Sequence, residues 1–472
     1  MFDKYIEENK EKMIENLKDM ISYISISIEN LDSQYPFGEE CSKCLHYVLD
    51  LANSLGFRTK NIDEYCGYIE FGEGEELVGI VGHLDVVPAS DDWKYEPFNA
   101  NISNGKIYGR GTIDDKGPVI ATIYAMKAVM DNCKIDKRVR LILGLNEEKA
   151  WKCIKYYKEH EEIPRYGFSP DASFPVIFAE KGILSYWFEE KYSSDKKIVI
   201  KNIDCNNNPF NVVPKICKVE LKVDDENDFD EVIKNIKEIN EIYNFNIDIE
   251  KTQNSIIQIT SNGISAHSAH PELGENAISK LIIILNDLLE KYNCNNDLFK
   301  FFKEKINTEY NGETLGIKIK DESGILTLNV AKLVLEEDKL KIGINLRIPV
   351  TKPIVEIEEK LEDIVKEYED INSYTYAKSN PLHMDLESDI IKTLLGVYNK
   401  RTNSNMKPVA IGGATFAKAF KNFVSFGPIM PGAVDMCHQS DEYIEIDNLI
   451  LCAKIYADTI YELCNRNICN IM

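Results

Sequence analysis

The sequence predicts an α/β protein in which one domain, a mixed sheet sandwiched by helices, is interrupted by an inserted α+β domain. The chain has 472 residues, which exceeds a typical single domain. From Phe57 to Gly182, strand patterns alternate with helix patterns, as in an α/β layer. About 200 residues of different texture follow, and the α/β character resumes at Pro381. The expected division is 1–182 for the first segment, 183–380 for the insertion and 381–472 for the second segment.

The first segment contains charged surface helices and apolar strands. Two runs, Val78 to Val81 and Val139 to Leu143, are continuously apolar, which is typical of strands covered on both faces. Ligands of such sheets gather at the carboxyl ends of the strands. The helices expected from periodicity lie near Tyr5 to Tyr23, at Cys41 to Leu55 and at Val119 to Met130, the last beginning at Gly117-Pro118.

The insertion mixes strands and helices and contains no triplet of candidate metal ligands. Its expected strands are Lys197 to Ile203, Ile256 to Thr260 and Leu340 to Arg347, and its expected helices are Glu231 to Tyr243, Ala277 to Tyr292 and Ile354 to Tyr368. The second segment is expected to contain helices at Ser388 to Asn399 and Asp447 to Leu463.

Composition excludes some classes of binding partner and indicates the cellular compartment. The net charge of −23 argues against nucleic acid and anionic membrane surfaces. No apolar stretch reaches the length of a membrane span, and the first residues lack the pattern of a signal peptide. Twelve cysteines without regular spacing predict reduced thiols in a cytoplasmic protein. We expect Cys41 and Cys44 to lie on a buried helix face rather than to bind zinc.

One motif carries most of the functional information. His83 ends an apolar strand, and Asp85 follows two residues later, so both side chains point to the same side. The Asp85 carboxylate can accept the spare imidazole N–H and leave the other nitrogen free for a metal. The alternative is a strand-end histidine satisfied by a neighbouring loop.

Further motifs supply oxygen and nitrogen ligands near predicted strands and helices. They contain Asp114 and Asp115, Glu147 and Glu148, Asp171, and His438. This mixed set suits zinc best, with manganese or cobalt as alternatives. Five ligands are too many for one open tetrahedral site but suit two ions that share a carboxylate and together polarise a carbonyl. One glutamate of the adjacent pair would bind metal and the other would act as a general base. The motifs therefore predict a two-metal hydrolase, although chemistry alone cannot choose between Asp114 and Asp115.

The ordered motifs GHLDVVP, GRGTIDDKGP, NEE followed by WKC, FSPDA, ISAHSAHPELGENA, IGGATFA and HQSDE resemble the M20 family of metallopeptidases, in particular its bacterial PepV-like dipeptidases. The resemblance runs from His83 to Glu442. It implies a zinc-aminopeptidase-like catalytic domain with an inserted lid. It also implies that one ion is held by His83, Asp114 and Asp171 and the other by Asp114, Glu148 and His438, while Asp85 orients His83 and Glu147 is the base.

The resemblance assigns substrate contacts as well. His267 would stabilise the oxyanion, and Arg347 would clamp the free carboxylate of the substrate. Asn211 would help to bind the substrate, and the loop containing Gly413 and Thr415 would offer backbone N–H groups. Without the family, His267 is better interpreted as a surface histidine. For Arg347, the alternative is an arginine on a strand of the lid that forms a surface ion pair. The chain departs from the family at Ala414, Phe416 and Lys149-Ala150, but it keeps every ligand.

The expected reaction is hydrolysis of dipeptides with free termini. The alternative within the fold is deacylation of N-acyl amino acids such as acetylornithine or succinyl-diaminopimelate. The long insertion favours a monomer whose own lid limits substrate length. A non-catalytic binding protein of the same fold would be expected to lack a metal-ligating residue or the general base. This chain has all five metal-ligating residues and Glu147.

Overall fold

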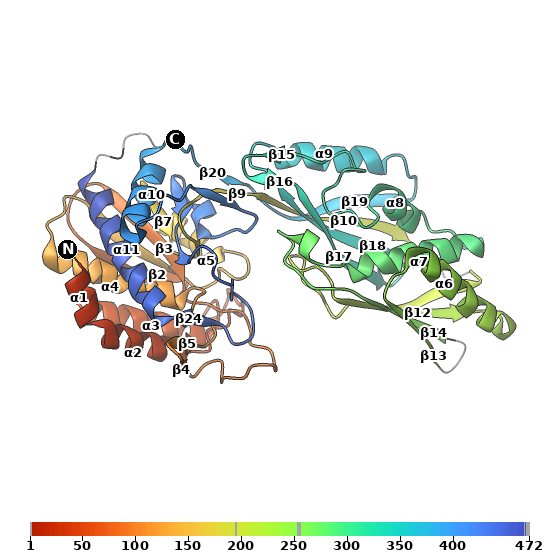
Figure 1. The fold of residues 1–472 in the computed structure, drawn as a ribbon, viewed down its shortest axis with the longest axis horizontal. Helices are drawn as coiled ribbons and strands as arrows, with labels where there is room; N and C mark the ends of the chain where they lie inside the picture. Colours follow the sequence, from red (N-terminus) through yellow and green to blue (C-terminus); the bar gives the residue numbers. More distant parts are fainter. Residues whose placement is uncertain (1, 194–195, 253–255, 467, 469–472) are drawn as a thin grey trace. The chain divides into compact units, whose positions relative to one another are not determined.

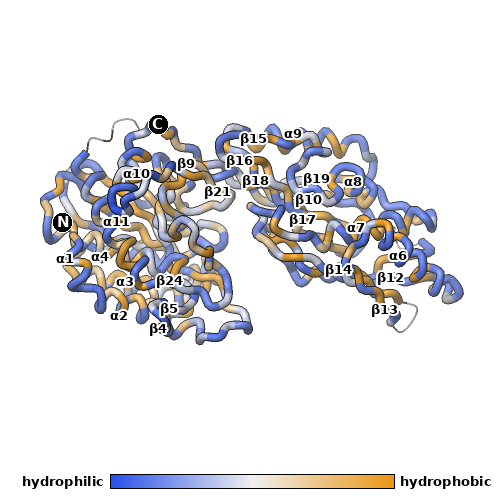
Figure 2. The backbone as a smooth tube through the Cα atoms, viewed as in Figure 1, coloured by the Kyte–Doolittle hydropathy of each residue, from blue (hydrophilic) through white to orange (hydrophobic). Residues whose placement is uncertain are grey.

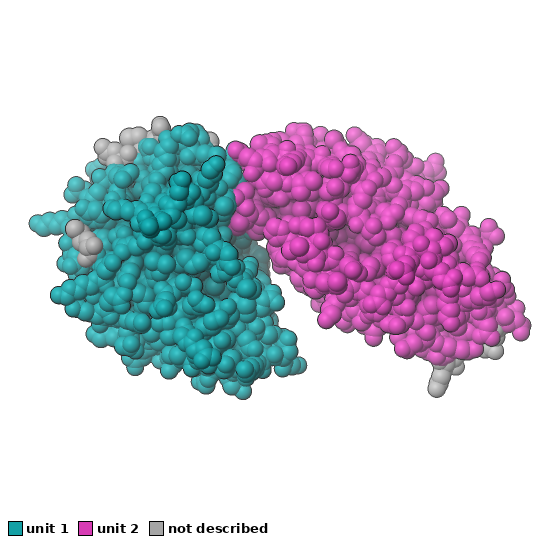
Figure 3. All heavy atoms as spheres, viewed as in Figure 1, with its two compact units in different colours: residues 1–179, 382–409, 414–472 teal, residues 180–381, 410–413 magenta. Residues whose placement is uncertain are grey.

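The computed structural model describes residues 2–193, 196–252, 256–466 and 468. The chain divides into two compact units, coloured separately in Figure 3. Unit 1 contains residues 1–179, 382–409 and 414–472, and unit 2 contains residues 180–381 and 410–413. The second unit is therefore an insertion into the first, and it also includes a short separate segment, residues 410–413.

Unit 1 is built on a mixed sheet of nine strands (Figure 1). The strands, in spatial order, are β1 (Arg58–Ile62), β2 (Cys66–Phe71), β6 (Arg138–Gly144), β3 (Leu77–His83), β7 (Tyr166–Ser169), β22 (Phe423–Ser425), β9 (Ile177–Glu180) and β20 (Leu382–His383), with β21 (Val409–Ile411) also paired to β9. β3 pairs in parallel with both β6 and β7, so the carboxyl ends of these three strands meet at one edge. All seven residues of β3 are buried, which explains its continuous apolar sequence.

Helices cover both faces of this sheet. The unit 1 helices are α1 (Asp3–Glu8), α2 (Lys10–Ile21), α3 (Glu39–Ser54), α4 (Lys116–Asn132), α5 (Lys152–His160), α10 (Asp389–Thr402), α11 (Ile446–Asn465) and the short η3 (Phe416–Ala419). A side chain at Gly82 would meet Val119 of α4, whereas one at Gly144 would meet Phe416 of η3 and Cys153 of α5. The predicted sandwich of helices around a mixed sheet is therefore confirmed.

Two small sheets complete unit 1. β4 (Asn101–Ser103), β5 (Lys106–Tyr108) and β24 (Tyr443–Glu445) form one, and β8 (Ala172–Ser173) and β23 (Pro428–Ile429) form the other. Both join the first segment of the chain to the second, which positions the two segments against each other.

Unit 2 contains two four-stranded antiparallel sheets. In spatial order, one has β17 (Thr327–Glu336), β18 (Lys339–Ile348), β10 (Gly182–Lys191) and β19 (Ile371–Ser379), and the other has β11 (Ile198–Asp204), β12 (Ile216–Val223), β14 (Ile256–Asn262) and β13 (Ile247–Lys251), besides the short pair β15 (Lys320–Asp321) and β16 (Gly324–Ile325). Its helices are η1 (Glu226–Asp228), α6 (Phe229–Tyr243), η2 (Pro271–Leu273), α7 (Ala277–Lys291), α8 (Asp297–Lys305) and α9 (Ile354–Val365). The inward faces of the sheets and helices form one apolar core, and Figure 2 shows the hydrophobic segments within each unit.

The thiols behave largely but not entirely as predicted. Cys41 and Cys44 are fully buried on the inner face of α3, as expected. The expectation that every thiol is reduced is wrong for one pair, because Cys205 and Cys217 form a disulfide. β11 and β12 pair antiparallel with Asp204 opposite Lys218, so the next two residues face each other, with their Cα atoms 4.2 Å apart. Among the described residues, no helix has the length and apolar character needed to cross a membrane.

Candidate active site

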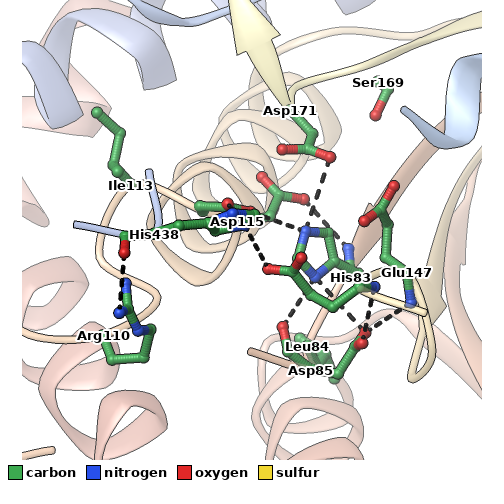
Figure 4. A network of polar contacts seen from close by, with 12 residues as sticks. His83, Leu84, Asp85, Arg110, Ile113, Asp115, Glu147, Ser169, Asp171 and His438 are labelled. Carbon is green, nitrogen blue, oxygen red and sulfur yellow. Dashed lines mark hydrogen bonds and ion pairs between the residues drawn. The ribbon is translucent and has the colours of Figure 1, made fainter. Parts of the chain in front are cut away.

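The centre of the site is His83 at the carboxyl end of β3 (Figure 4). Its side chain is completely buried. Its Nδ1 lies 2.8 Å from the backbone carbonyl oxygen of Asp85 and 3.5 Å from the Asp85 carboxylate. The carbonyl is therefore the nearer acceptor for the ring N–H, whereas the sequence suggested the carboxylate. In either case the second ring nitrogen, Nε2, is left free as a ligand.

That second nitrogen faces two carboxylates. His83 Nε2 lies 3.0 Å from Asp114 Oδ1 and 3.6 Å from Asp171 Oδ2. Asp114 precedes α4, and Asp171 follows β7, so both come from loops beside the end of β3. The ligand atoms of these three residues all lie within 4.8 Å of one another, which suits a single ion.

A second group of ligands shares Asp114. His438 Nε2 lies 3.1 Å from Asp114 Oδ2 and 3.0 Å from Glu148 Oε1. Asp114 therefore presents one carboxylate oxygen to each imidazole. The two groups, each with its ligand atoms within 4.8 Å of one another, fit two cations that share this carboxylate.

The electrostatics of the cluster also fit bound cations. Burial raises the pKa of the Glu147, Glu148 and Asp171 carboxyl groups, and repulsion from neighbouring carboxylates adds to this effect. A buried cluster with more carboxylates than imidazoles is costly when ionised, and divalent cations would offset that cost. The donor set is nitrogen and oxygen, with no thiol in either group.

Asp85 organises the turn that carries the two glutamates. Its buried carboxylate accepts hydrogen bonds from the backbone N–H groups of Glu147 (3.0 Å) and Glu148 (3.1 Å). The indole Nε1 of Trp151 donates to the Glu147 carbonyl at 2.8 Å. The Trp151 ring packs edge-on against Phe416, which in turn packs edge-on against His83. Hydrogen bonds therefore fix both the N–H and the carbonyl of Glu147, as well as the N–H of Glu148.

Glu442 is a residue whose role the sequence analysis missed. Its carboxylate is buried, pairs with Arg110 at 2.7 Å, and accepts the backbone N–H groups of Ile113 (3.0 Å) and Asp114 (3.3 Å). Burial raises the pKa of Glu442 to about 7, although the Arg110 guanidinium opposes this shift. The position of Glu442 four residues after His438 was visible in the sequence, but nothing there indicated that it contacts the loop of Asp114.

The substrate contacts expected outside the metal groups divide between the units. Thr415 is buried in unit 1, where its hydroxyl accepts a hydrogen bond from the Ala417 N–H. Asn211, His267, Arg347 and Gly413 belong to unit 2.

Within unit 2, the segments of Asn211 and His267 are joined, because the Ser268 N–H donates to the Asn211 carbonyl at 2.8 Å. Arg347 on β18 is 4% exposed; its Nε donates to Asn345 Oδ1, and its Nη1 donates to the Gly412 carbonyl. Burial lowers the pKa of Arg347 to about 10. The alternative of a surface ion pair is therefore wrong: Arg347 is buried, and in the described part of the chain no carboxylate pairs with it.

Comparison with known proteins identifies the family. The model of "Peptidase family M20/M25/M40" matches residues 79–462. The chain belongs to this family. It is 36% identical over 465 residues to "Putative dipeptidase YtjP" of Bacillus subtilis, covering 96% of this chain and 97% of that protein. It is 33% identical over 476 residues to a "Putative dipeptidase" of Staphylococcus epidermidis, covering 98% and 99%.

Solved structures show the same fold. Human carnosine dipeptidase 1 superposes with a TM-score of 0.60 at 16% identity, covering 98% of both chains. Dug1p of Saccharomyces cerevisiae superposes with a TM-score of 0.58 at 13% identity, covering 98% of both chains. Family membership makes this M20-family protein a peptide hydrolase, and the deacylase alternative is not favoured by these relatives.

Proposed function

We propose that this M20-family protein is a dinuclear metallo-dipeptidase that hydrolyses dipeptides with free termini. The main support is the geometry of Asp114, whose two carboxylate oxygens face His83 and His438 separately. The names of the whole-length relatives support dipeptides as the substrate class.

The proposed ligands are His83, Asp114 and Asp171 for one ion and Asp114, Glu148 and His438 for the other. Zinc suits this donor set best, and manganese or cobalt would bind the same residues. Bound divalent ions would polarise the scissile carbonyl and lower the pKa of a water molecule. Unit 1 is then the catalytic domain.

Glu147 is the proposed general base. It is the one member of the Glu147-Glu148 pair that belongs to neither ligand group, so its carboxylate is free to take a proton from the attacking water and give it to the leaving amine. Asp85 and Trp151 bind the backbone of Glu147 and thereby limit its movement. This arrangement suits a base that must stay at a fixed distance from its water.

Unit 2 is proposed as the lid that recognises the substrate. The buried guanidinium of Arg347 would bind the free carboxylate of the dipeptide, since two parallel hydrogen bonds fit that group. His267 would stabilise the oxyanion, Asn211 would assist binding, and backbone N–H groups near Gly413 and Thr415 would reach the same carboxylate. The substrate would then be a small peptide bound through its free carboxylate and at its scissile carbonyl.

A monomer in the cytoplasm is the proposed working state. The nine cysteines among the described residues that form no disulfide support a reducing compartment, while the Cys205–Cys217 disulfide argues against it. Light scattering of the purified protein would measure the oligomeric state, and mass spectrometry after alkylation of cells would measure the oxidation of this pair. A dimer, or complete oxidation of Cys205 and Cys217 in cells, would contradict the proposed state.

The decisive experiment measures hydrolysis of Leu-Gly by the purified protein. Activity should disappear with a chelator, return with zinc or manganese, and be far lower on N-acetyl-leucine than on Leu-Gly. Metal analysis after gel filtration should give two ions per chain. Chelator-resistant cleavage, or a preference for the acylated amino acid, would overturn the proposal.

A further inference from the structure

Residues 25–29, which we call the N-terminal segment, lie against two loops that carry candidate active-site residues. The segment follows α2 and belongs to no helix or strand. The Ser25 hydroxyl donates to the Leu84 carbonyl at 2.6 Å, and the Val86 N–H donates to the Ser25 carbonyl at 3.0 Å. The segment is therefore fixed beside the loop that contains Asp85, although its sequence indicated no role in the site.

Asn146 connects the N-terminal segment to the second loop. It lies two residues after the end of β6, directly precedes Glu147, and is completely buried. Its side-chain amide donates to Ser27 Oγ at 3.0 Å and to Glu29 Oε1 at 3.2 Å. Both donors of the amide group are therefore used on the N-terminal segment.

The acceptors of Asn146 close the loop of the two glutamates. Its Oδ1 accepts the Lys152 N–H at 3.1 Å, and its backbone carbonyl accepts the Trp151 N–H at 3.0 Å. Glu147 and Glu148 lie between these contacts in the sequence. The N-terminal segment therefore fixes an amide that joins the two ends of this loop.

Glu29 is a strong acceptor for that amide. Its side chain is 25% exposed, and the Lys152 ammonium also pairs with it. The hydrogen bond from Lys152 lowers the pKa of Glu29, burial opposes this shift, and the hydrogen bond from Asn146 adds to it. An ionised acceptor forms a stronger hydrogen bond than a neutral one does.

The two glutamates do not depend equally on the loop. In the proposed function Glu148 binds metal, so a bound ion also holds its carboxylate. Glu147 belongs to neither ligand group, so the position of its carboxylate depends on the backbone that carries it. A displacement of about 1 Å can cost about 100-fold in rate. A shift of the loop should therefore affect Glu147 more than Glu148.

We propose that Asn146 is a positioning residue for Glu147 and that Ser27 and Glu29 hold Asn146 in place. This inference rests on the proposed role of Glu147 as the general base. Because these residues act through the loop, loss of their contacts should lower kcat while KM and metal content stay nearly unchanged. A purely structural role, in which Asn146 caps the start of α5, would lower the Tm without changing kcat per folded molecule.

The first test removes both acceptors of the Asn146 amide. The double variant Ser27→Ala, Glu29→Ala should lower kcat for Leu-Gly about tenfold and retain two ions per chain. Glu29→Ala alone leaves one acceptor and should lower kcat about threefold, which keeps the test informative if the double variant does not fold. Glu15→Ala is the matched control, because Glu15 is an exposed carboxylate on α2. The proposal is overturned if the folded variants have the same kcat as Glu15→Ala.

The second test reverses the polarity of the contact. Asn146→Asp alone would place a carboxylate at the 3.2 Å contact with Glu29 and should lower kcat about tenfold or more. Adding Glu29→Gln supplies an amide that can donate to the new carboxylate, and the Ser27 hydroxyl can donate to it as well. This pair of changes should recover most of kcat. Failure to recover would show that the hydrogen bonds do not position the loop.

The third test separates this inference from the proposed function by repeating the first in a Glu147→Gln background. Without the Glu147 carboxylate, loss of the Ser27 and Glu29 acceptors should lower kcat no further. An equal fall in both backgrounds would overturn the positioning role and leave the general base intact. Full kcat in Glu147→Gln itself would refute the proposed base, and the positioning role with it.

Discussion

The division of work between two adjacent glutamates can be tested by exchanging each carboxylate for an amide. In the Glu147→Gln variant, the backbone N–H still donates to Asp85 and the backbone carbonyl still accepts from Trp151, because neither contact uses the side chain. Glu147 is also absent from both ligand groups. We therefore expect this variant to fold normally and to bind two metal ions, with only the proton acceptor lost.

The expected cost is the contribution of general base catalysis. That contribution is typically about 10²- to 10⁴-fold in rate, or about 2.7 to 5.5 kcal/mol of transition-state stabilisation. The fall should appear in kcat for Leu-Gly, with little change in KM, since the amide retains the volume of the glutamate side chain.

Glu148→Gln is the matched comparison. Its carboxylate lies 3.0 Å from His438 and belongs to the second ligand group, so its loss should lower the metal content toward about one ion per chain. Elemental analysis of both variants after gel filtration separates the two roles. If Glu147→Gln loses metal while Glu148→Gln keeps two ions, the assignment of base and ligand is reversed, and the reasoning from the two ligand groups fails.

Three further predictions follow from contacts around the site. Arg347→Ala should raise KM for free dipeptides about tenfold or more and hardly affect C-terminally amidated ones. The reason is that the guanidinium has no carboxylate partner of its own in the described chain. Equal losses on both substrates would exclude binding of the substrate carboxylate by Arg347. Glu442→Gln should weaken zinc binding by about 10- to 100-fold in a competition titration, since Glu442 holds the loop of Asp114. The exposed Glu445→Gln is its control, and equal zinc affinities would contradict that role. Chelation should lower the Tm in differential scanning fluorimetry. If the free metal was at 100 times its Kd before chelation, the free energy of unfolding should fall by about 2.7 kcal/mol. An unchanged Tm would indicate that the folded protein does not bind the metal.

Much of the fold could be predicted because its signals are local. The apolar run of β3 and the 3.6-residue periodicity of α7 and α9 depend on neighbours in sequence, and both appear in the structure close to their expected bounds. Helix α8 was not expected. It is short, and its start depends on Asn296, whose side chain accepts the Phe299 N–H, a signal that is weak without its tertiary packing.

Non-local contacts explain what the sequence did not reveal. The Cys205–Cys217 disulfide depends on the register between β11 and β12, which spacing alone does not specify. The contact of Glu442 with Ile113 joins residues more than 300 positions apart. The Asp85 carboxylate lies 3.5 Å from the His83 imidazole, which it was expected to face. It also caps the turn of the two glutamates, a role visible only once β3 and β6 are paired in parallel.

The choice between Asp114 and Asp115 shows how the backbone resolves a chemical ambiguity. Both carboxylates are buried beside His83, and either could bind a metal on chemical grounds. Asp115 points one oxygen at the His83 backbone N–H, 3.1 Å away, so it supports the end of β3 from the side of α4. Asp114 instead contacts the histidine side chains: its two carboxylate oxygens face the imidazoles of His83 and His438. Asp115→Ala, which removes the acceptor of the His83 N–H, should therefore reduce thermal stability more than metal content. Asp114→Ala should instead abolish binding of both ions. The opposite pattern in paired thermal and elemental measurements would exchange the two residues and contradict the assignment of Asp114 as the shared ligand.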